Sequence, residues 1–230
     1  GQNNQGKNAA EKFLINWAAQ NITSGNLKNV RICTENTVLN INGQERIVDI
    51  EFRRHYDEKN KYSASYFNFK DRTEEIKLLQ IEHYRATHDS LTELLNKEAF
   101  FSEVAKHLAK DPKTPKYFIC TDIINFKFVN DVFGKEMGDK ILKFEAKLLE
   151  TAGNKFIKTG RIGGDIFGIL INKEDFIEAE AERYAESIQE FSRNLNYKMI
   201  MHVGIYEIEN PHDSVLTIFE KAKIAVESIK

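Results

Sequence analysis

The sequence predicts an α+β fold in which a mostly antiparallel sheet is flanked by helices. Two observations carry this prediction. Short apolar segments of strand length lie at about residues 117–123, 155–162, 165–171 and 198–206. Longer segments, in which apolar residues recur at helical spacing, alternate with them at about residues 97–110, 138–151, 173–194 and 212–230. Because only a short turn separates the second and third strands, they form a hairpin.

A smaller antiparallel sheet is expected ahead of this domain. After a short helix at residues 10–20, extended segments follow at residues 30–41, 45–53 and 62–69, with a strong hairpin signal at Asn42-Gly43. The stretch Asn68–Thr73 resembles the Asp-x-Thr motif at the C-terminal end of a PAS domain. Since only one helix and three strands of that fold are recognisable, a sensor module and a plain packing or dimerisation element both remain open.

Composition narrows the class of protein. The formal net charge is −2, from 33 basic and 35 acidic residues, which argues against a nucleic-acid-binding surface or a polybasic membrane patch. No apolar run is long enough to span a membrane, so the expected location is cytoplasmic. Cys33 and Cys120 each stand among apolar neighbours, and we expect two buried free thiols, as in a reducing cytosol.

The stretch Arg161–Gly168 lies at the corner of the predicted hairpin. Gly163-Gly164 permits positive φ and lets a bulky ligand approach the main chain. Asp165 follows at once and places a carboxylate beside two bare amides. This arrangement suits a metal ion and a phosphate, although an ordinary Gly-Gly turn with a solvated aspartate has the same sequence.

A second polar group follows the strand that ends near Asp122. Lys127, Asn130 and Asp139 stand five, eight and seventeen residues after that aspartate. Together with Gly163-Gly164-Asp165, these residues closely resemble the GGDEF domain, the diguanylate cyclase family of bacterial signalling. The resemblance covers roughly residues 83–230 and includes residues 89–97, which are similar to the family's opening motif D-x-L-T-G-L-x-N-R.

The resemblance implies a division of the chain. Residues 1–70 form a partial PAS-like segment, residues 71–88 a linker helix, and residues 89–230 the GGDEF domain. In similar proteins such a linker pairs across a dimer and transmits a signal. A plain helix lying against its own domain is the alternative, since barely two heptads are present.

The resemblance also implies a site for GTP and Mg²⁺ (or Mn²⁺). In the family, two GTP molecules on two facing domains condense to cyclic-di-GMP and pyrophosphate, so a homodimer is the expected catalytic form. The metal ligands are matched by Asp122, Asp165 and the Ile123 carbonyl, and the two aspartates are the catalytic residues. The nucleotide-binding residues are matched by Asn125, Phe126 and Lys127 at the phosphates, Asn130 and Asp139 at the guanine, and Gly163 and Gly164 beside the α-phosphate.

Several positions depart from the family's pattern, among them Glu93 and Lys97 of the opening motif, which stand in place of its Gly and Arg. Ile166 stands where the motif has Glu, and Ile124 where a second acid is frequent. Glu227 occupies the place of a phosphate-binding Lys, for which Lys230 is a weak substitute. The product-binding R-x-x-D motif is missing, since Asn154 and Ile157 take its Arg and Asp positions. These departures predict an impaired cyclase without product feedback through that motif.

Three functions remain open from the sequence. The first is an impaired GGDEF module that binds GTP and regulates a partner, such as a neighbouring EAL phosphodiesterase domain. The second is a working diguanylate cyclase in which Asp122 and Asp165 suffice for the metal. The third is a purely structural dimerisation or interaction domain.

Overall fold

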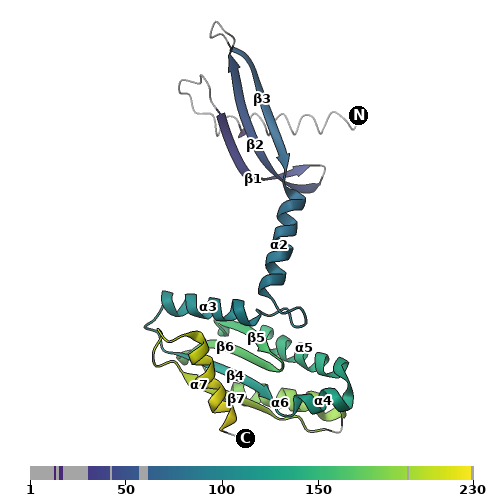
Figure 1. Cartoon of the computed structure of the whole chain (residues 1–230), viewed down its shortest axis with the longest axis vertical. Helices are drawn as coiled ribbons and strands as arrows, with labels where there is room; N and C mark the ends of the chain where they lie inside the picture. Colours follow the sequence, from purple (N-terminus) through teal and green to yellow (C-terminus); the bar gives the residue numbers. More distant parts are fainter. Residues whose placement is uncertain are drawn as a thin grey trace. The chain divides into compact units, whose positions relative to one another are not determined.

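The structure is a computed structural model that describes residues 13, 16–17, 31–41, 43–56, 62–195 and 197–228. The chain divides into two compact units, Gly1–His83 and Tyr84–Lys230. Figure 1 gives the order of their elements along the chain.

The first unit contains the predicted three-stranded antiparallel sheet. Its strands β1 (Arg31–Ile41), β2 (Gln44–Tyr56) and β3 (Tyr62–Asp71) lie in the order β1-β2-β3. One face carries a small core in which Val48, Ile50 and Phe52 pack with Trp17. The helix predicted at residues 10–20 falls mostly outside the described residues, of which Phe13, Asn16 and Trp17 are helical.

The prediction that both cysteines are buried is wrong for Cys33. Both thiols are free, but Cys120 is buried and Cys33 is exposed. Side chains alternate between the two faces of a strand, and in β1 it is the neighbouring Ile32 that packs against the small core. The apolar neighbours of Cys33 in the sequence therefore do not predict whether its own side chain is buried.

The helix α2 (Thr73–Thr87) follows β3 directly, close to the predicted span of 71–87. Its first residue is fixed to the sheet, because Thr73 N donates to Asp71 Oδ1 at 2.9 Å and Ile47 N donates to Thr73 Oγ1 at 2.9 Å. Several large apolar side chains of this helix are exposed, namely Leu78, Leu79, Ile81 and Tyr84.

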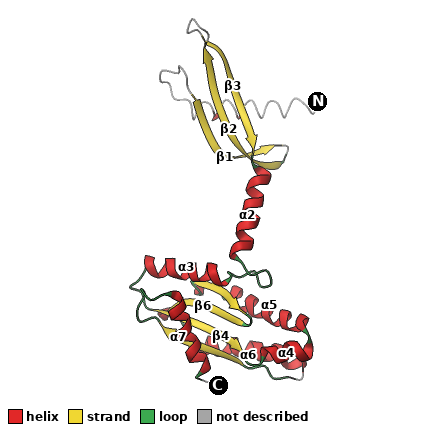
Figure 2. Cartoon of the chain, viewed as in Figure 1, coloured by secondary structure: helices red, strands yellow, loops and turns green. Residues whose placement is uncertain are grey.

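The second unit contains a four-stranded sheet with the order β5-β6-β4-β7 (Figure 1). Figure 2 distinguishes this sheet from the helices around it by colour. Its strands are β4 (Lys116–Ile123), β5 (Lys158–Gly163), β6 (Ile166–Asn172) and β7 (Met201–Glu207). All three pairings are antiparallel, and β4 lies between β6 and β7. The predicted α+β class with a mostly antiparallel sheet is confirmed.

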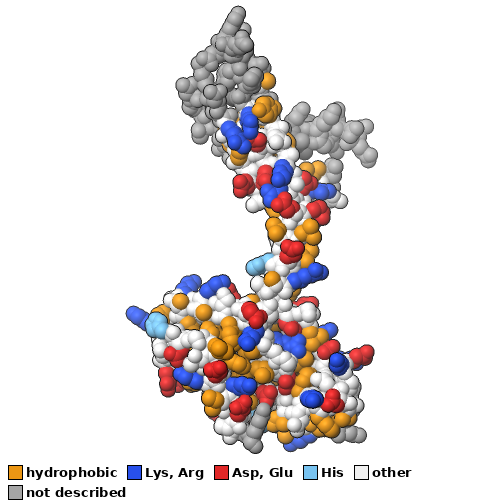
Figure 3. Space-filling view, in the orientation of Figure 1, with side chains coloured by type: hydrophobic (Ala, Val, Ile, Leu, Met, Phe, Trp, Pro, Cys, Tyr) orange, Lys and Arg blue, Asp and Glu red, His pale blue; other side chains and the backbone are white. Residues whose placement is uncertain are grey.

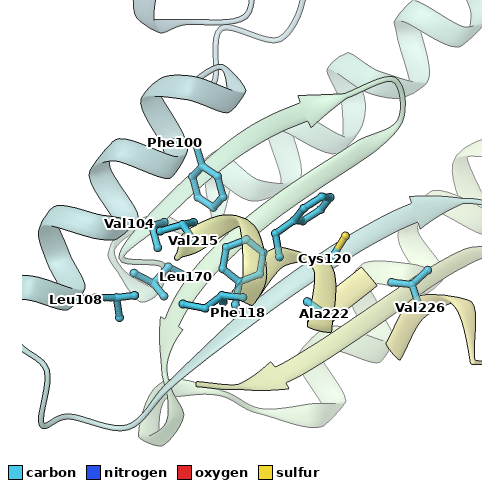
Figure 4. Packing of buried hydrophobic residues seen from close by; sticks show 11 residues of the cluster. Phe100, Val104, Leu108, Phe118, Cys120, Leu170, Val215, Ala222 and Val226 are labelled. Atoms are coloured by element: carbon cyan, nitrogen blue, oxygen red, sulfur yellow. The ribbon is translucent and has the colours of Figure 1, made fainter. Parts of the chain in front are cut away.

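Two pairs of helices cover the two faces of this sheet. On the α3/α7 face, α3 (Lys97–Lys110) and α7 (Val215–Glu227) enclose Phe118, Cys120 and Leu170, as Figure 4 shows. On the α5/α6 face, α5 (Lys135–Thr151) and α6 (Glu178–Phe191) pack on the intervening strand residues, such as Ile119 and Ile169. The alternation along β4 thus assigns each of its side chains to one face.

Short helices were the least predictable elements. The structure has α4 (Phe126–Phe133) where the sequence suggested only a turn at Asn125-Phe126. The long helix expected over residues 173–194 is divided into the 3₁₀ turn η2 (Lys173–Asp175), α6, and the 3₁₀ turn η3 (Ser192–Leu195). A further 3₁₀ turn, η1 (Gly153–Lys155), follows α5. By contrast, α3 has the predicted bounds and is capped by Asn96, which accepts from Ala99 N at 3.0 Å.

Within the part of the chain that the structure describes, no helix has both the length and the apolar character needed to cross a membrane. Basic and acidic side chains are interspersed on the face that Figure 3 shows, in keeping with the net charge of −2.

Candidate functional site

The tip of the β5–β6 hairpin lies beside the end of β4. Since β6 runs antiparallel to β4, with Thr121 opposite Phe167, the residues just before β6 come next to the last residues of β4. Asp165 Oδ2 accepts a hydrogen bond from Ile123 N at 3.0 Å. The structure therefore brings Asp165 to the backbone of the residue that follows the half-buried Asp122.

The glycines of the hairpin turn have backbone conformations that other residues rarely adopt. Gly163 has φ +151° and Gly164 has φ +59°. A Cβ added to either would meet no atom of the other described residues within 4 Å. These glycines are therefore required by the turn itself, and the space beside them is open to a ligand.

Arg161 holds this turn in place. Its Nε and Nη2 donate to Gly164 O at 3.0 and 2.8 Å, and its Nη1 donates to Asp89 Oδ1 at 2.9 Å. The same Asp89 oxygen accepts from Thr92 N and Thr92 Oγ1 at 2.9 and 2.8 Å. Partial burial alone would raise the pKa of Asp89, but the bonds from Arg161 and Thr92 outweigh it and hold that pKa below its usual value. The sequence alone did not indicate this role of Arg161, because its partner Asp89 lies 72 residues away in the chain.

The second part of the site is built on α4 and α5. Asn125 has φ +57° and turns the chain from β4 into α4, and Gly134, with φ +84°, turns it from α4 into α5. A Cβ at Gly138 would collide with Asn130 Oδ1. The absence of a side chain at Gly138 thus allows the Asn130 amide to lie against the backbone of α5, one residue before Asp139.

The remaining predicted residues differ in exposure. Lys127 and Asp139 are exposed, Asn130 is half-buried, and Asn125 is exposed. Phe126 packs into the core on the α5/α6 face, so its side chain has a structural role and only its backbone is open to a ligand. Because β4 leads directly into α4, both parts of the site lie at the same end of the sheet.

The two isoleucines that replace acids are packed as apolar residues. Ile166 is half-buried against the core of the α3/α7 face. Asp122 lies on the same face, because its neighbour Thr121 is paired with Phe167 and both of these side chains point to the opposite face. Ile124 is half-buried, and its N donates to Ile200 O at 2.9 Å. Asp122 and Asp165 are thus the carboxylates that the predicted metal site retains.

Two basic residues that the sequence did not single out lie near Asp122. His202 stands directly opposite Asp122 in the β4–β7 pairing, and its buried Nδ1 has no hydrogen-bond partner within the described part of the chain. Burial and the Asp122 carboxylate raise the pKa of the Cys120 thiol to about 12, while the Lys223 ammonium acts in the opposite direction. Lys223 of α7 is therefore within electrostatic range of the end of β4.

The position predicted to lack a phosphate-binding lysine is exposed. Glu227 lies 3.8 Å from Lys223 Nζ, one turn earlier on α7. Lys230, the possible substitute, lies outside the described residues.

The oxygen atoms present suit an Mg²⁺ ion only in part. Asp122, Asp165 and the Ile123 carbonyl are hard oxygen donors of the kind that Mg²⁺ prefers. Among the described residues, however, no group of three or more His, Cys, Asp or Glu is placed to hold a metal ion. The residues therefore fit an ion that shares its coordination with nucleotide phosphates and waters, as Mg²⁺ commonly does.

Comparison with known proteins decides the family. Residues 86–230 match the family described as "Diguanylate cyclase, GGDEF domain". The chain belongs to the GGDEF domain family. That match covers the whole of the second unit except its first residues and confirms the predicted resemblance.

Curated GGDEF relatives match over a similar part of the chain. A diguanylate cyclase of Vibrio cholerae is 29% identical over 167 residues, which are 70% of this chain and 51% of the relative. The signaling protein YkoW of Bacillus subtilis is 31% identical over 173 residues, 70% of this chain and 21% of that protein. The chain therefore spans about half the length, or less, of these relatives.

Solved GGDEF structures share the fold. The coiled coil and GGDEF domain of DgcB from Caulobacter crescentus, solved with c-di-GMP, superposes with a TM-score of 0.55 at 22% identity, covering 67% of this chain and 86% of that one. A diguanylate cyclase/phosphodiesterase from Caldicellulosiruptor saccharolyticus gives a TM-score of 0.54 at 21% identity, with 64% and 88% covered.

Proposed function

We propose that this GGDEF domain binds GTP and acts as a regulatory module of cyclic-di-GMP signalling, with little or no cyclase activity of its own. The observation that carries the proposal is the packing of Ile166. A half-buried apolar side chain that packs against the core of the α3/α7 face occupies the position where the family has an acid, in a site that retains Asp122, Asp165 and the two glycines.

Guanine recognition is supported by the contact between α4 and α5. Asn130 is held against Gly138, next to Asp139. An amide and a carboxylate together can satisfy the acceptor O6 and the N1–H and N2–H donors of guanine. A half-buried amide in a fixed position loses little freedom when it binds, which favours affinity.

Phosphate and metal binding are supported by the strand ends. The open side of Gly163 and Gly164, the backbone amides of Asn125 and Phe126, and the exposed Lys127 suit triphosphate oxygens. Asp122, Asp165 and the Ile123 carbonyl would hold Mg²⁺, which supplies neutralisation of phosphate charge when bound. Asp165 is already positioned by its bond from Ile123 N.

The same strand ends lead us to expect slow condensation. Attack of a 3′-hydroxyl on an α-phosphate requires a metal-assisted loss of its proton, on two domains that face each other in a dimer. Ile124 and Ile166 can neither bind a metal through their side chains nor accept a proton. Loss of such groups commonly lowers a rate by about 10²–10⁴-fold.

The proposal that this domain regulates a partner is in keeping with the different activities of its relatives. Those that match include a diguanylate cyclase and the cyclic di-GMP phosphodiesterase PdeB of Shewanella oneidensis, 27% identical over 68% of this chain and 19% of that protein. Nucleotide binding here would then control a neighbouring catalytic domain, such as an EAL phosphodiesterase.

The test of this proposal is GTP affinity, measured by calorimetry with Mg²⁺ present. Asn130→Ala is expected to weaken binding by about 1–3 kcal/mol, because it leaves buried guanine groups unpaired. The matched control is Asn172→Ala, which removes an asparagine that bonds Asp175 Oδ2 at the other end of β6. Equal affinities of the unmodified chain and Asn130→Ala, or no GTP binding at all, would remove the proposed function.

A further inference from the structure

A cavity of about 520 Å³ lies on the α5/α6 face, away from the nucleotide site. It is bounded by the sheet, by the C-terminal end of α5 and by residues 180–187 of α6. Its lining is mostly apolar and includes Ile119, Leu148, Phe156, Ile169, Phe176 and Val203. None of the predicted nucleotide or metal residues lines it. Its volume lies within the range of about 300–1,000 Å³ that small-molecule sites occupy.

A buried carboxyl group stands behind one wall of this cavity. Thr121 and Tyr184 line the cavity, and both donate to Glu145 Oε1, from Thr121 Oγ1 at 2.7 Å and from Tyr184 OH at 2.9 Å. The Glu145 side chain is fully buried, and its second oxygen, Oε2, has no hydrogen-bond partner among the residues that the structure describes. Glu145 itself does not line the cavity, and the two hydroxyl groups that do have already donated their protons to it, so the wall they form holds no spare proton for a ligand.

The Glu145 carboxyl group behind Thr121 and Tyr184 is uncharged near neutral pH. Burial raises the pKa of Glu145 to about 8, while the hydrogen bonds from Thr121 and Tyr184 act in the opposite direction. The carboxyl group therefore keeps its proton at pH 7, and a protonated carboxyl donates one hydrogen bond.

The charged residues at the rim of the cavity pair with one another. Lys155 Nζ lies 2.6 Å from Glu180 Oε1 and so joins η1, the turn that follows α5, to α6. Arg183 Nη2 lies 3.8 Å from the same oxygen. Asp175 at the rim accepts from Asn172 Nδ2 at 2.9 Å. A charged ligand would have to break these pairs or leave its own charge without a partner.

We propose that this cavity binds a neutral, largely apolar small molecule of the size of two or three fused rings. The rings pack between the sheet and α6, against Ile119, Ile169 and Val203. This second site is independent of the GTP proposal.

The test uses prodan, a neutral naphthalene dye with one ketone, whose emission moves to the blue in apolar surroundings. Titration of the whole chain is expected to give saturable binding with a blue shift. Ala181 lines the cavity, and Ala181→Leu fills part of it, so prodan affinity should fall at least tenfold. The control is Ala179→Leu, the same change two residues earlier at an exposed position of α6, which should leave the affinity unchanged.

Two further dyes test the preference for a neutral ligand. N-phenyl-1-naphthylamine is neutral, and 1-anilinonaphthalene-8-sulfonate is the same molecule with an added sulfonate, so we expect the sulfonate to bind at least fivefold more weakly. Absence of saturable prodan binding, equal effects of the two alanine substitutions, displacement of prodan by GTP, or equal affinity for the two naphthylamine dyes would each overturn the proposal.

Discussion

The two halves of the proposed nucleotide site differ in how many polar groups of the family's pattern they retain. The helical half, formed by α4 and α5, keeps its polar groups, with Asn130 seated against Gly138 beside Asp139. The strand half, formed by the end of β4 and the hairpin, keeps Asp122 and Asp165 but has isoleucine at positions 124 and 166.

This difference shows how binding and chemistry can separate within one site. In the proposed site, guanine recognition would depend on a close approach of two helices, which a single glycine permits. Phosphoryl transfer would depend on the number of carboxylates around a metal, and each apolar replacement lowers that number without disturbing the helices. On this proposal, a GGDEF domain can lose turnover while its nucleotide pocket persists.

Glu145 connects the halves, and it gives the largest predicted effect. It belongs to α5 but bonds Thr121 of β4, the residue before Asp122. Burial raises its pKa from 4.5 to about 8, so the folded state keeps a proton that the unfolded state releases. Stability from this group is fully present below pH 4.5 and is lost as the pH rises towards 8, at a slope of up to about 1.4 kcal/mol per pH unit.

Urea unfolding at pH 5, 6 and 7 measures this slope. Glu145→Gln, which cannot titrate, should lack the loss that the unmodified chain shows, a difference of about 3 kcal/mol across the range. Parallel pH profiles of the two chains would show that Glu145 is not a buried neutral acid.

The next effect tests how firmly the strand half is held. Arg161→Ala removes the bonds to Gly164 O and leaves Asp89 without its cation, so we expect a loss of about 2–3 kcal/mol in the free energy of unfolding. Arg193→Ala is the control, because its pair with Glu190 is exposed on both sides and should matter by less than about 0.5 kcal/mol. Similar values for the two variants would mean that Arg161 does not secure the hairpin.

The smallest effect separates stability from affinity in the helical half. In Gly138→Ala the new Cβ displaces the Asn130 side chain from its seat, so GTP affinity should fall about tenfold, or about 1.4 kcal/mol. Stability should change by less than about 1 kcal/mol, since Ala favours the helix.

A double-mutant cycle shows whether the effect passes through Asn130. Adding Asn130→Ala to Gly138→Ala should cause little further loss of GTP affinity, since both act on one group. Fully additive losses would contradict the seating of Asn130 by Gly138.

Much of this fold could be predicted from local patterns. The strands of both sheets and the helix α3 follow from apolar periodicity and from caps such as Asn96. The helix α4 was missed because eight residues give little periodicity and its start depends on the left-handed backbone of Asn125.

The long-range contacts of the site could not be predicted from the sequence. The bond from Arg161 to Asp89 joins residues far apart in the chain. Glu145 has the sequence signature of an exposed helical acid, and only the packing of α5 on β4 buries it. Likewise, His202 comes opposite Asp122 through strand register alone.

Product formation tests the central claim most directly. The purified chain is incubated with GTP and Mg²⁺ at a concentration that favours dimers, and the nucleotides are separated by chromatography, with Ile166→Glu in parallel. We expect bound GTP but no cyclic-di-GMP from the unmodified chain, and product from Ile166→Glu if that acid is the main loss. Cyclic-di-GMP from the unmodified chain in amounts equal to those from Ile166→Glu would contradict the account and establish a working cyclase.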